Sequence, residues 1–354
     1  MLKVAHVVNT LSCGGAERVA INIYNCLKDK YENDFIIAKN IIKLSIDFIP
    51  KVIFNKKPPL PSFLYEKLLL YRLKETLKDY DIIISHLRDM NTRLSYLKSK
   101  NLIKSNLILV EHVTIECYSK KERRIIKNFY KYADLIIAVS DKVKDGLVKF
   151  FELDPSKIKV IYNGIDIKTI NKLSEEYQPE LKKPCIVSAG RLSDDKDFET
   201  LIKGVYYSKT KPYLYILGEG SKKSELENLI RNLKIEDKVF LVGFVKNPFP
   251  YIKNCDLYIT SSIREAFPMS SLEAMALKKP IISTDVVPFA KHNFNSFVFK
   301  PKDYISLANY IDKLLSSEEL RSFLSKNAYE TAKEFSIESM CMQYRNLIQK
   351  IAIQ

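Results

Sequence analysis

Short runs of β-branched and other apolar residues alternate with helical stretches along the whole chain. Strands that alternate with helices predict βαβ units and a parallel sheet covered by helices. The first series of expected strands occupies 4–8, 35–38, 81–85, 107–110, 135–139 and 159–162. After a polar stretch at 172–183, a second series follows at 185–189, 213–217, 239–242, 257–260, 280–283 and 296–299. The pattern therefore predicts an α/β protein with two domains.

The length of the chain agrees with this division, because 354 residues are enough to bury two hydrophobic cores. We expect one domain over 1–168, a linker over 169–182 and a second domain over 183–337. Apolar residues at helical spacing between Ser336 and Ile353 predict a final helix. We expect this helix at about 338–354, packed back on the first domain.

The composition is that of a globular protein, with 46% hydrophobic and 28% charged residues. The first residues are typical of a strand rather than of a signal peptide, and no apolar run approaches the roughly 20 residues of a membrane-spanning helix. The cysteines show neither a C-x-x-C pair nor metal-ligand spacing. We interpret all of them as packing residues in a reducing, cytoplasmic compartment: Cys13, Cys26, Cys117, Cys185, Cys255 and Cys341.

Positive charge is concentrated in the first half, where residues 1–170 carry +11 of the net +15. Such a surface can face anionic lipid or a phosphate-bearing acceptor, or can simply be solvated. Between Lys56 and Leu77 an aromatic and basic stretch predicts an amphipathic helix that lies either on a membrane or on the sheet. Nucleic acid is not an expected partner, because no recognition module is present.

A glycine pair, Gly14-Gly15, follows the first expected strand and leads into a helix. Free amides at a helix amino-terminus attract phosphate. The segment matches neither the G-x-G-x-x-G fingerprint of dehydrogenases nor the P-loop of ATPases. It therefore indicates an anion site of another type, or a plain turn.

The second domain carries cations and two glutamates at the ends of expected strands. Gly190-Arg191 and Lys196 follow one strand, and cations there can neutralise a diphosphate leaving group. Glu265 and Glu273 stand eight positions apart, with Pro268 between them. Proline suits the first turn of a helix, so we expect Glu265 on a loop and Glu273 within the helix. The amides near Met269 and Ser270 would then meet phosphate.

These features, in this order, resemble the retaining family-4 glycosyltransferases of the GT-B fold, whose two Rossmann-like domains carry parallel sheets that face across a cleft. The resemblance covers nearly the whole chain and includes Asn163-Gly164-Ile165-Asp166, Gly218-Glu219-Gly220 and Gly243-Phe244-Val245. It departs at Ala266 and Lys279, which replace glycines, and in a shortened loop from Asp285 to Phe297.

The resemblance implies a role for each site residue. Arg191 and Lys196 would bind the donor diphosphate, Glu265 the transferred sugar and Glu273 the ribose. The main chain near Val245 would bind the base, and His112 would lie near the sugar. The remaining donor-binding residues would be Gly14, Gly15, Gly190, Phe267, Pro268, Met269 and Ser270.

The resemblance also implies a reaction. We expect transfer of a hexose or N-acetylhexosamine from a UDP-sugar, with retention of configuration and with neither metal nor cofactor. The acceptor would be a polyprenyl-diphosphate-linked glycan of bacterial capsule or lipopolysaccharide synthesis, at the inner face of the membrane. A nucleotide-sugar epimerase of the same fold and a non-catalytic nucleotide-sugar-binding subunit remain as alternatives.

Overall fold

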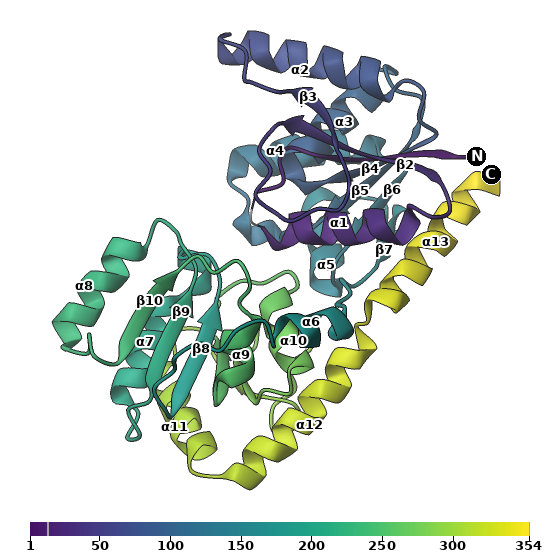
Figure 1. Ribbon diagram of the computed structural model, residues 1–354. Coiled ribbons are helices and arrows are strands. Elements are labelled where there is room, and N and C mark those ends of the chain that lie inside the picture. The colour runs from purple at the N-terminus through teal and green to yellow at the C-terminus, as the bar shows by residue number, and fades with distance from the viewer. Residues whose placement is uncertain (13, 354) are drawn as a thin grey trace. The chain divides into compact units, whose positions relative to one another are not determined.

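The computed structural model describes residues 1–12 and 14–353. The chain divides into two compact units (Figure 1). Unit 1 runs from Met1 to Gly164 and also includes the last helix, from Ile337 onward. Unit 2 runs from Ile165 to Ser336. Cys13, which we interpreted as a packing residue, lies outside the described residues.

Unit 1 is a parallel sheet with helices on its faces. Its seven strands lie in the order β3-β2-β1-β4-β5-β6-β7. The strands are β1 Lys3–Val8, β2 Glu32–Lys39, β3 Lys51–Phe54, β4 Ile82–His86, β5 Asn106–Glu111, β6 Leu135–Ala138 and β7 Ile158–Val160. The helices are α1 Gly15–Leu27, α2 Ser62–Leu77, α3 Leu87–Ser99, α4 Lys120–Phe129, α5 Asp141–Phe151 and α13 Ile337–Ile353. Central strands are buried almost throughout because helices cover both faces of the sheet.

The sequence pattern missed strand β3, at the edge of the sheet. β3 pairs in parallel with β2, yet no α-helix lies between the two strands. Only Phe54 of its four residues is buried. An edge strand buries too little side-chain surface to show a clear apolar run, which is why the alternation did not predict it.

Unit 2 repeats this architecture with six strands in the order β10-β9-β8-β11-β12-β13. The strands are β8 Cys185–Ala189, β9 Tyr213–Leu217, β10 Val239–Gly243, β11 Leu257–Thr260, β12 Ile281–Thr284 and β13 Phe297–Phe299. The helices are α6 Ile167–Leu173, α7 Phe198–Tyr207, α8 Lys223–Leu233, α9 Phe249–Asn254, α10 Met269–Ala276, α11 Tyr304–Leu315 and α12 Glu318–Glu334. The two sheets confirm the predicted α/β class.

The boundary between the units differs from the expected linker at 169–182. Helix α6 begins within two residues of the boundary and packs on α9 and α10, so it belongs to unit 2. Asp166 caps it by accepting a hydrogen bond from the Thr169 amide. Of the expected linker, residues 169–173 are therefore helical, whereas 174–182 contain neither helix nor strand.

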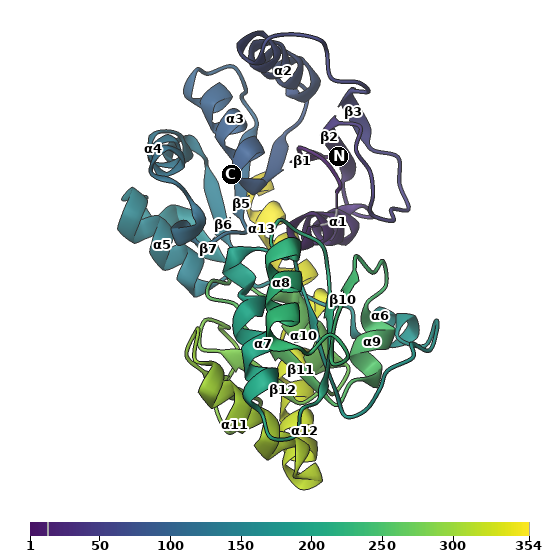
Figure 2. The same cartoon turned by 90° about the vertical axis from the view of Figure 1, so that its left-hand side faces the viewer.

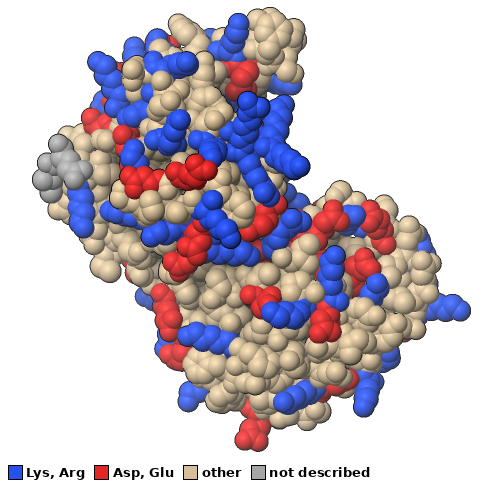
Figure 3. All heavy atoms as spheres, turned by 180° about the vertical axis from the view of Figure 1, so that it is seen from behind, with Lys and Arg blue, Asp and Glu red and all other residues tan. Residues whose placement is uncertain are grey.

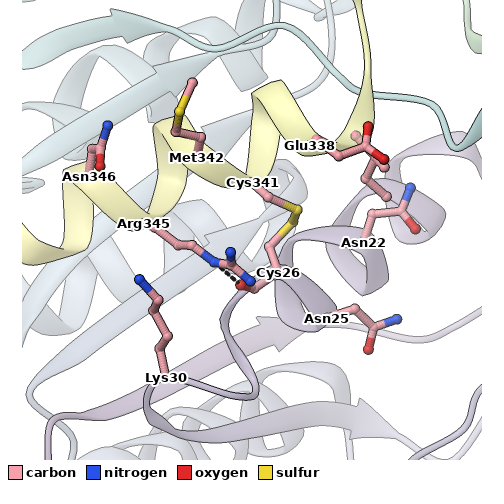
Figure 4. Close-up of a pocket in the computed structure, with 10 residues that line it drawn as sticks. Asn22, Asn25, Cys26, Lys30, Glu338, Cys341, Met342, Arg345 and Asn346 are labelled. Atoms are coloured by element: carbon pink, nitrogen blue, oxygen red, sulfur yellow. Dashed lines mark hydrogen bonds between the residues drawn. A yellow bond between two sulfur atoms is a disulfide. The ribbon is translucent and has the colours of Figure 1, made fainter.

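The last helix, α13, packs on α1 within unit 1 (Figures 1 and 2). Its buried side chains are Met340, Tyr344, Leu347 and Ile348. Cys341 of α13 forms a disulfide with Cys26 of α1, and Arg345 Nε donates to the Cys26 carbonyl at 2.7 Å (Figure 4). The interpretation of every cysteine as a packing residue is therefore wrong for this pair, because residues 315 positions apart cannot be paired from spacing alone. Cys185 and Cys255 are buried free thiols, whereas Cys117 is exposed.

Helix α2 packs on unit 1 and also exposes apolar side chains. Tyr65, Leu69, Leu73 and Leu77 are buried at four-residue spacing. Phe63 and Tyr71 are 63% and 57% exposed. Figure 3 shows many Lys and Arg side chains on unit 1, as the charge of its sequence predicts. None of the helices in residues 1–12 and 14–353 has the length and apolar character that crossing a bilayer requires.

Candidate active site

Most of the predicted site residues of unit 2 lie at the point where the strand order of its sheet reverses. From β8 the chain adds β9 and β10 on one side, and it then returns from β10 to add β11, β12 and β13 on the other side of β8. In doubly wound sheets, ligands bind beyond the carboxyl ends of the strands at such a point. The loops after β8 and β11 therefore define the candidate site.

Hydrogen bonds join these two loops. The Ile263 amide donates to the Asp195 carbonyl at 2.9 Å, and Ser261 Oγ donates to the Lys196 carbonyl at 2.9 Å. Beneath them, Ser188 Oγ donates to the Ile259 carbonyl at 2.6 Å. The loops therefore form one unit, so that cations from one and carboxylates from the other keep a fixed relation.

Lys196 and Glu265 meet at the centre of this site. Lys196 Nζ lies 2.6 Å from Glu265 Oε1, and Ser262 Oγ donates to the same oxygen at 2.7 Å. The Glu265 side chain is only 9% exposed, so this ion pair is largely desolvated. A buried ion pair is strong only when its geometry is fixed, and the Ser262 contact helps to fix it. A small pocket is lined by both residues together with Ser188, Thr260 and Ser270.

Glycines in the neighbouring loop explain how the cation-bearing loop is supported. The Leu192 amide donates to the Glu219 carbonyl at 3.0 Å. Gly218 has φ +148°, and a Cβ there would lie 1.9 Å from the Gly190 carbonyl oxygen. A Cβ on Gly220 would lie 2.2 Å from the Leu192 oxygen. The two backbones can approach this closely only because these positions have no side chain.

The other predicted donor residues occupy loop ends and the start of α10. Arg191 is exposed on the loop after β8. Met269 and Ser270 open α10, with Pro268 at its N-cap, and Glu273 is partly buried one turn later. Val245 follows Gly243, whose φ is +87°. Glu265 therefore lies on a loop and Glu273 within a helix, which is the arrangement that Pro268 predicted.

Phe267 has a different environment from the one expected of a ligand contact. Its ring is buried and packs against Phe289 at 5.4 Å and Phe335 at 5.3 Å between ring centroids. The side chain therefore supports the loop from the core side. Any contact of Phe267 with a donor would have to come from its main chain.

An acidic side chain that sequence reasoning did not anticipate lies against the glycine pair of unit 1. Gly14 is the N-cap of α1, and Gly15 begins the helix. The buried Glu17 side chain folds back over Gly14 and accepts a hydrogen bond from Ser12 Oγ at 2.9 Å. A carboxylate already interacts with this helix amino-terminus, so a phosphate could bind there only if Glu17 moved.

His112 follows β5 in unit 1, and a buried carboxylate holds its loop. Glu111 Oε1 accepts from the Val113 amide at 3.1 Å and from Tyr118 Oη at 2.7 Å, while Oε2 accepts from Tyr130 Oη at 2.9 Å. Burial raises the pKa of Glu111, and these donors oppose that rise. Sequence reasoning did not select Glu111, although a glutamate ending an otherwise apolar strand is a signal that could have found it.

His112 also contacts a second histidine that sequence reasoning missed. Its Nε2 lies 3.4 Å from Nδ1 of the fully buried His86. Burial lowers the pKa of His112 to about 4, so the ring is neutral at pH 7. His112 is therefore suited to hydrogen bonding with an uncharged group.

Two further features lie apart from these residues. A pocket of about 520 Å³ around the disulfide is lined by residues of α1 and α13, including Glu338 and Arg345, and by Lys30, which follows α1 (Figure 4). No predicted site residue lines it. Across residues 1–12 and 14–353, no three His, Cys, Asp or Glu side chains come together as a group that could hold a metal ion.

Two parallel Rossmann-like sheets, with a lysine–glutamate pair at the switch point of the second, place the chain in the GT-B fold class. Two family models match consecutive parts of the chain: "Glycosyltransferase Family 4" over residues 13–169 and "Glycosyl transferases group 1" over residues 169–331. The chain belongs to the glycosyltransferase family that these two models describe.

Relatives and solved structures agree with this assignment along the full length. A Campylobacter jejuni protein named "N-acetylgalactosamine-N,N'-diacetylbacillosaminyl-diphospho-undecaprenol 4-alpha-N-acetylgalactosaminyltransferase" is 29% identical, covering 95% of this chain and 96% of its own. A second C. jejuni protein, an alpha-1,4-N-acetyl-D-galactosaminyltransferase acting on a diNAcBac-PP-undecaprenol glycan, is 24% identical and covers 99% of both chains. The Anabaena protein HepE in complex with UDP-glucose has the same fold, with a TM-score of 0.83 and 20% identity over 99% of this chain and 100% of its own.

Proposed function

We propose that this chain transfers a hexose or N-acetylhexosamine from a UDP-sugar to a polyprenyl-diphosphate-linked glycan, in the synthesis of a bacterial surface polysaccharide. The observation that carries the proposal is the desolvated pair of Lys196 and Glu265 at the switch point of unit 2. Its chemistry suits a donor with a diphosphate next to a sugar, because it offers a cation and a hydroxyl acceptor side by side.

In this proposal the ion pair positions the side chains of Lys196 and Glu265 to bind the donor. Lys196, with Arg191 and the first amides of α10, stabilises the negative charge that develops as the diphosphate departs. The described contacts of Glu265 both use Oε1, so its Oε2 can accept a hydrogen bond from a sugar hydroxyl. The proposed reaction uses neither a metal nor a cofactor, and it retains the anomeric configuration of the sugar.

The names of the relatives support the acceptor and the sugar class. Both C. jejuni proteins are named as N-acetylgalactosaminyltransferases whose acceptors are linked to undecaprenol through a diphosphate. The bound UDP-glucose of HepE supports a uridine diphosphate donor. Nothing specific to this chain favours an epimerase or a non-catalytic subunit over a transferase.

A donor panel tests the proposal. We expect UDP and UDP-sugars, but not GDP or ADP compounds, to raise the melting temperature, because a ligand that binds the native state stabilises it. Lys196→Ala should abolish this shift, whereas Lys203→Ala should not. Lys203 is a matched control because it pairs with Glu199 at the same 2.6 Å, but on an exposed helix surface. Transfer is then measured with the responding UDP-sugar and a synthetic undecaprenyl-diphosphate glycan. No stabilisation by any nucleotide would overturn the catalytic proposal.

The proposed location is the inner face of the membrane, reached through unit 1. Helix α2 offers exposed Phe63 and Tyr71, and Lys67 and Arg72 stand on the same helix. Aromatic side chains with nearby cations bind at the surface of anionic bilayers. We expect binding to anionic vesicles to exceed binding to neutral ones at low salt, and Phe63→Ser to weaken it. Phe323→Ser is the matched control, because Phe323 of α12 is 50% exposed. Equal binding to both kinds of vesicle would remove this part of the proposal.

A further inference from the structure

A line of polar side chains crosses the sheet of unit 1 and ends at His112. Asn33 lies on β2, His6 on β1 and His86 on β4, and His112 follows the end of β5. These four strands are consecutive neighbours in the sheet. Three of the chain's four histidines thus belong to one row, which we call the histidine row.

The strand register explains why the row lies on one face of the sheet. His6 pairs with Ile84, and His86 stands two positions further along β4. His86 in turn pairs with Val110, and His112 stands two positions further along the chain. Side chains two positions apart on a strand share a face, so each member is the diagonal neighbour of the next. The row therefore advances toward the carboxyl ends of the strands, where parallel sheets bind ligands.

The rings contact one another through their nitrogens. His112 Nε2 lies 3.4 Å from His86 Nδ1, and His86 Nε2 lies 3.5 Å from His6 Nδ1. The His86 ring centroid is 5.8 Å from that of His6 and 5.7 Å from that of His112. His6 and His86 are fully buried. Burial lowers the pKa of His6 to about 3 and that of His86 well below its usual value, so both rings are neutral.

Two neutral rings can share a hydrogen bond only if one nitrogen carries a proton and the other does not. A group at one end of the row therefore decides which nitrogen donates and which accepts at every contact along it. At the far end, Asn33 Nδ2 donates to the Tyr24 carbonyl at 3.0 Å. A carbonyl cannot donate, so the Asn33 amide has one permitted orientation, with Oδ1 left as an acceptor.

Asn33 Oδ1 and His6 Nε2 complete this end of the row. Both atoms are buried, and no hydrogen bond of regular geometry joins them to each other or to any other group in the described chain. Burial is the main influence on the pKa of His6, and Asn33 opposes it as a hydrogen-bond acceptor. His6 therefore carries its proton on Nε2, because a bare Nε2 would set two buried acceptors against each other.

The remaining protons follow in order. With Nε2 protonated, His6 Nδ1 is bare and accepts from His86 Nε2–H. His86 Nδ1 is then bare and accepts from His112 Nε2–H. This leaves Nδ1 of His112 as its unprotonated nitrogen. We propose that Asn33, His6 and His86 hold His112 in the Nε2–H tautomer, so that His112 offers Nδ1 only as a hydrogen-bond acceptor to a hydroxyl of the transferred sugar. His86 is thus a positioning residue for His112.

This inference deepens the proposed function and rests on it for the identity of the ligand. A neutral acceptor favours a sugar with a hydroxyl group at this point. It disfavours a sugar whose group there is a carboxylate or an amide oxygen, since both lack a proton to donate. The row thus selects among donor sugars without any charged group.

Nitrogen NMR of the histidine-labelled full chain at neutral pH tests the tautomer without any substrate. The four rings are assigned by single substitutions, including His292→Gln. His292 is an internal reference, because its Nδ1 accepts from the Val298 amide at 2.9 Å and it must also be Nε2–H. We expect His112 to match the pattern of His292, with the Nε2–H form exceeding the other by on the order of tenfold. An Nδ1–H or doubly protonated His112 would overturn the inference.

Substitutions within the row test whether it sets the tautomer of His112. His86→Phe removes both nitrogens and should give His112 a mixture of tautomers, with a lower kcat/KM for transfer. His86→Gln can still accept from one neighbour and donate to the other, so it should restore the single tautomer and much of the activity. Asn33→Leu gives a second route to a mixture if His86→Phe does not fold.

Each outcome separates this inference from the proposed function. A single Nε2–H tautomer of His112 in His86→Phe and in Asn33→Leu would show that the row does not set it, and would overturn the inference whatever the activity. Loss of all UDP-sugar binding in the wild type would overturn the proposed function and with it the assigned ligand. In that case the nitrogen NMR spectrum would still show which tautomer His112 adopts.

Discussion

At the scale of single residues, the contact between Lys196 and Glu265 gives each side chain a partner before any ligand arrives. An ion pair that is mostly desolvated leaves an uncompensated charge when one partner is removed. Glu265→Gln keeps the shape of the side chain and its contact with Ser262, but removes the charge that holds Lys196. We therefore expect a fall in kcat of at least about 100-fold, because positioned electrostatic groups contribute on this scale to catalysis. The assay is steady-state transfer from the UDP-sugar identified in the panel.

The control for this substitution is Glu199→Gln, which neutralises the exposed partner of Lys203. Exposed ion pairs of this kind stabilise a protein by less than about 1 kcal/mol. We expect its kcat to equal that of the wild type. Equal activity of Glu265→Gln and Glu199→Gln would mean that the pair at the switch point is merely structural.

At the scale of elements, the loops after β8 and β9 depend on glycine for their close approach. Gly218→Ala would place a Cβ 1.9 Å from the Gly190 oxygen at a position with φ +148°. The loop that carries Arg191 and Lys196 would have to move, at a cost of roughly 1–3 kcal/mol for the backbone strain alone. We expect a lower melting temperature and weaker nucleotide binding.

Gly190→Ala provides the comparison for stability. A Cβ there would meet Lys196 Cδ at 3.5 Å, which is an ordinary contact. Urea unfolding should therefore show a large decrease in the free energy of unfolding for Gly218→Ala and a small decrease for Gly190→Ala. Similar losses for both would contradict the role assigned to the close approach.

The attachment of α13 to α1 combines a disulfide with noncovalent packing. The bond closes a separation of 315 residues, for which the chain-entropy model gives about 5–6 kcal/mol of stabilisation. Cys341→Ala should therefore lower the melting temperature under oxidising conditions, and added reductant should remove the difference. The helix itself should remain, because Tyr344 and Ile348 stay buried against unit 1. Circular dichroism tests this, and loss of helical signal in the reduced protein would contradict it.

At the scale of the whole molecule, the histidines with lowered pKa values couple stability to pH. The pKa of His6 is lowered to about 3 and that of His112 to about 4, whereas unfolded histidine titrates near 6.5. Between these values the unfolded chain binds protons that the folded chain excludes. The free energy of unfolding should therefore fall as the pH drops from about 7 to 5, by about 1–2 kcal/mol for each of these histidines.

Urea unfolding at pH 7 and pH 5 measures this dependence. The raised pKa of Glu111 acts in the opposite direction, because the folded carboxyl group takes up its proton first. His6→Phe removes one of the histidines while keeping an aromatic ring beside Phe35. Its unfolding free energy should depend less on pH than that of the wild type, and an unchanged dependence would contradict the assignment.

The sequence by itself determined the class of the fold and the elements that carry the site. Strands buried on both faces, such as β5 and β11, appear as continuous apolar runs, because burial acts on nearly all of their residues. Glycines and a proline mark the loops, so the residues around Glu265 and Glu273 were enough to assign the first to a loop and the second to a helix. These features are local in the chain, and local features can be predicted from local patterns.

Tertiary structure alone decided which distant residues meet. Cys26 and Cys341 are brought together by the packing of α13 on α1, and Phe267 is turned to the core by Phe289 and Phe335. His6, His86 and His112 form a row only because β1, β4 and β5 are neighbours in a particular register. Strand order and register depend on the packing of the whole sheet, and no short segment of the chain contains that information.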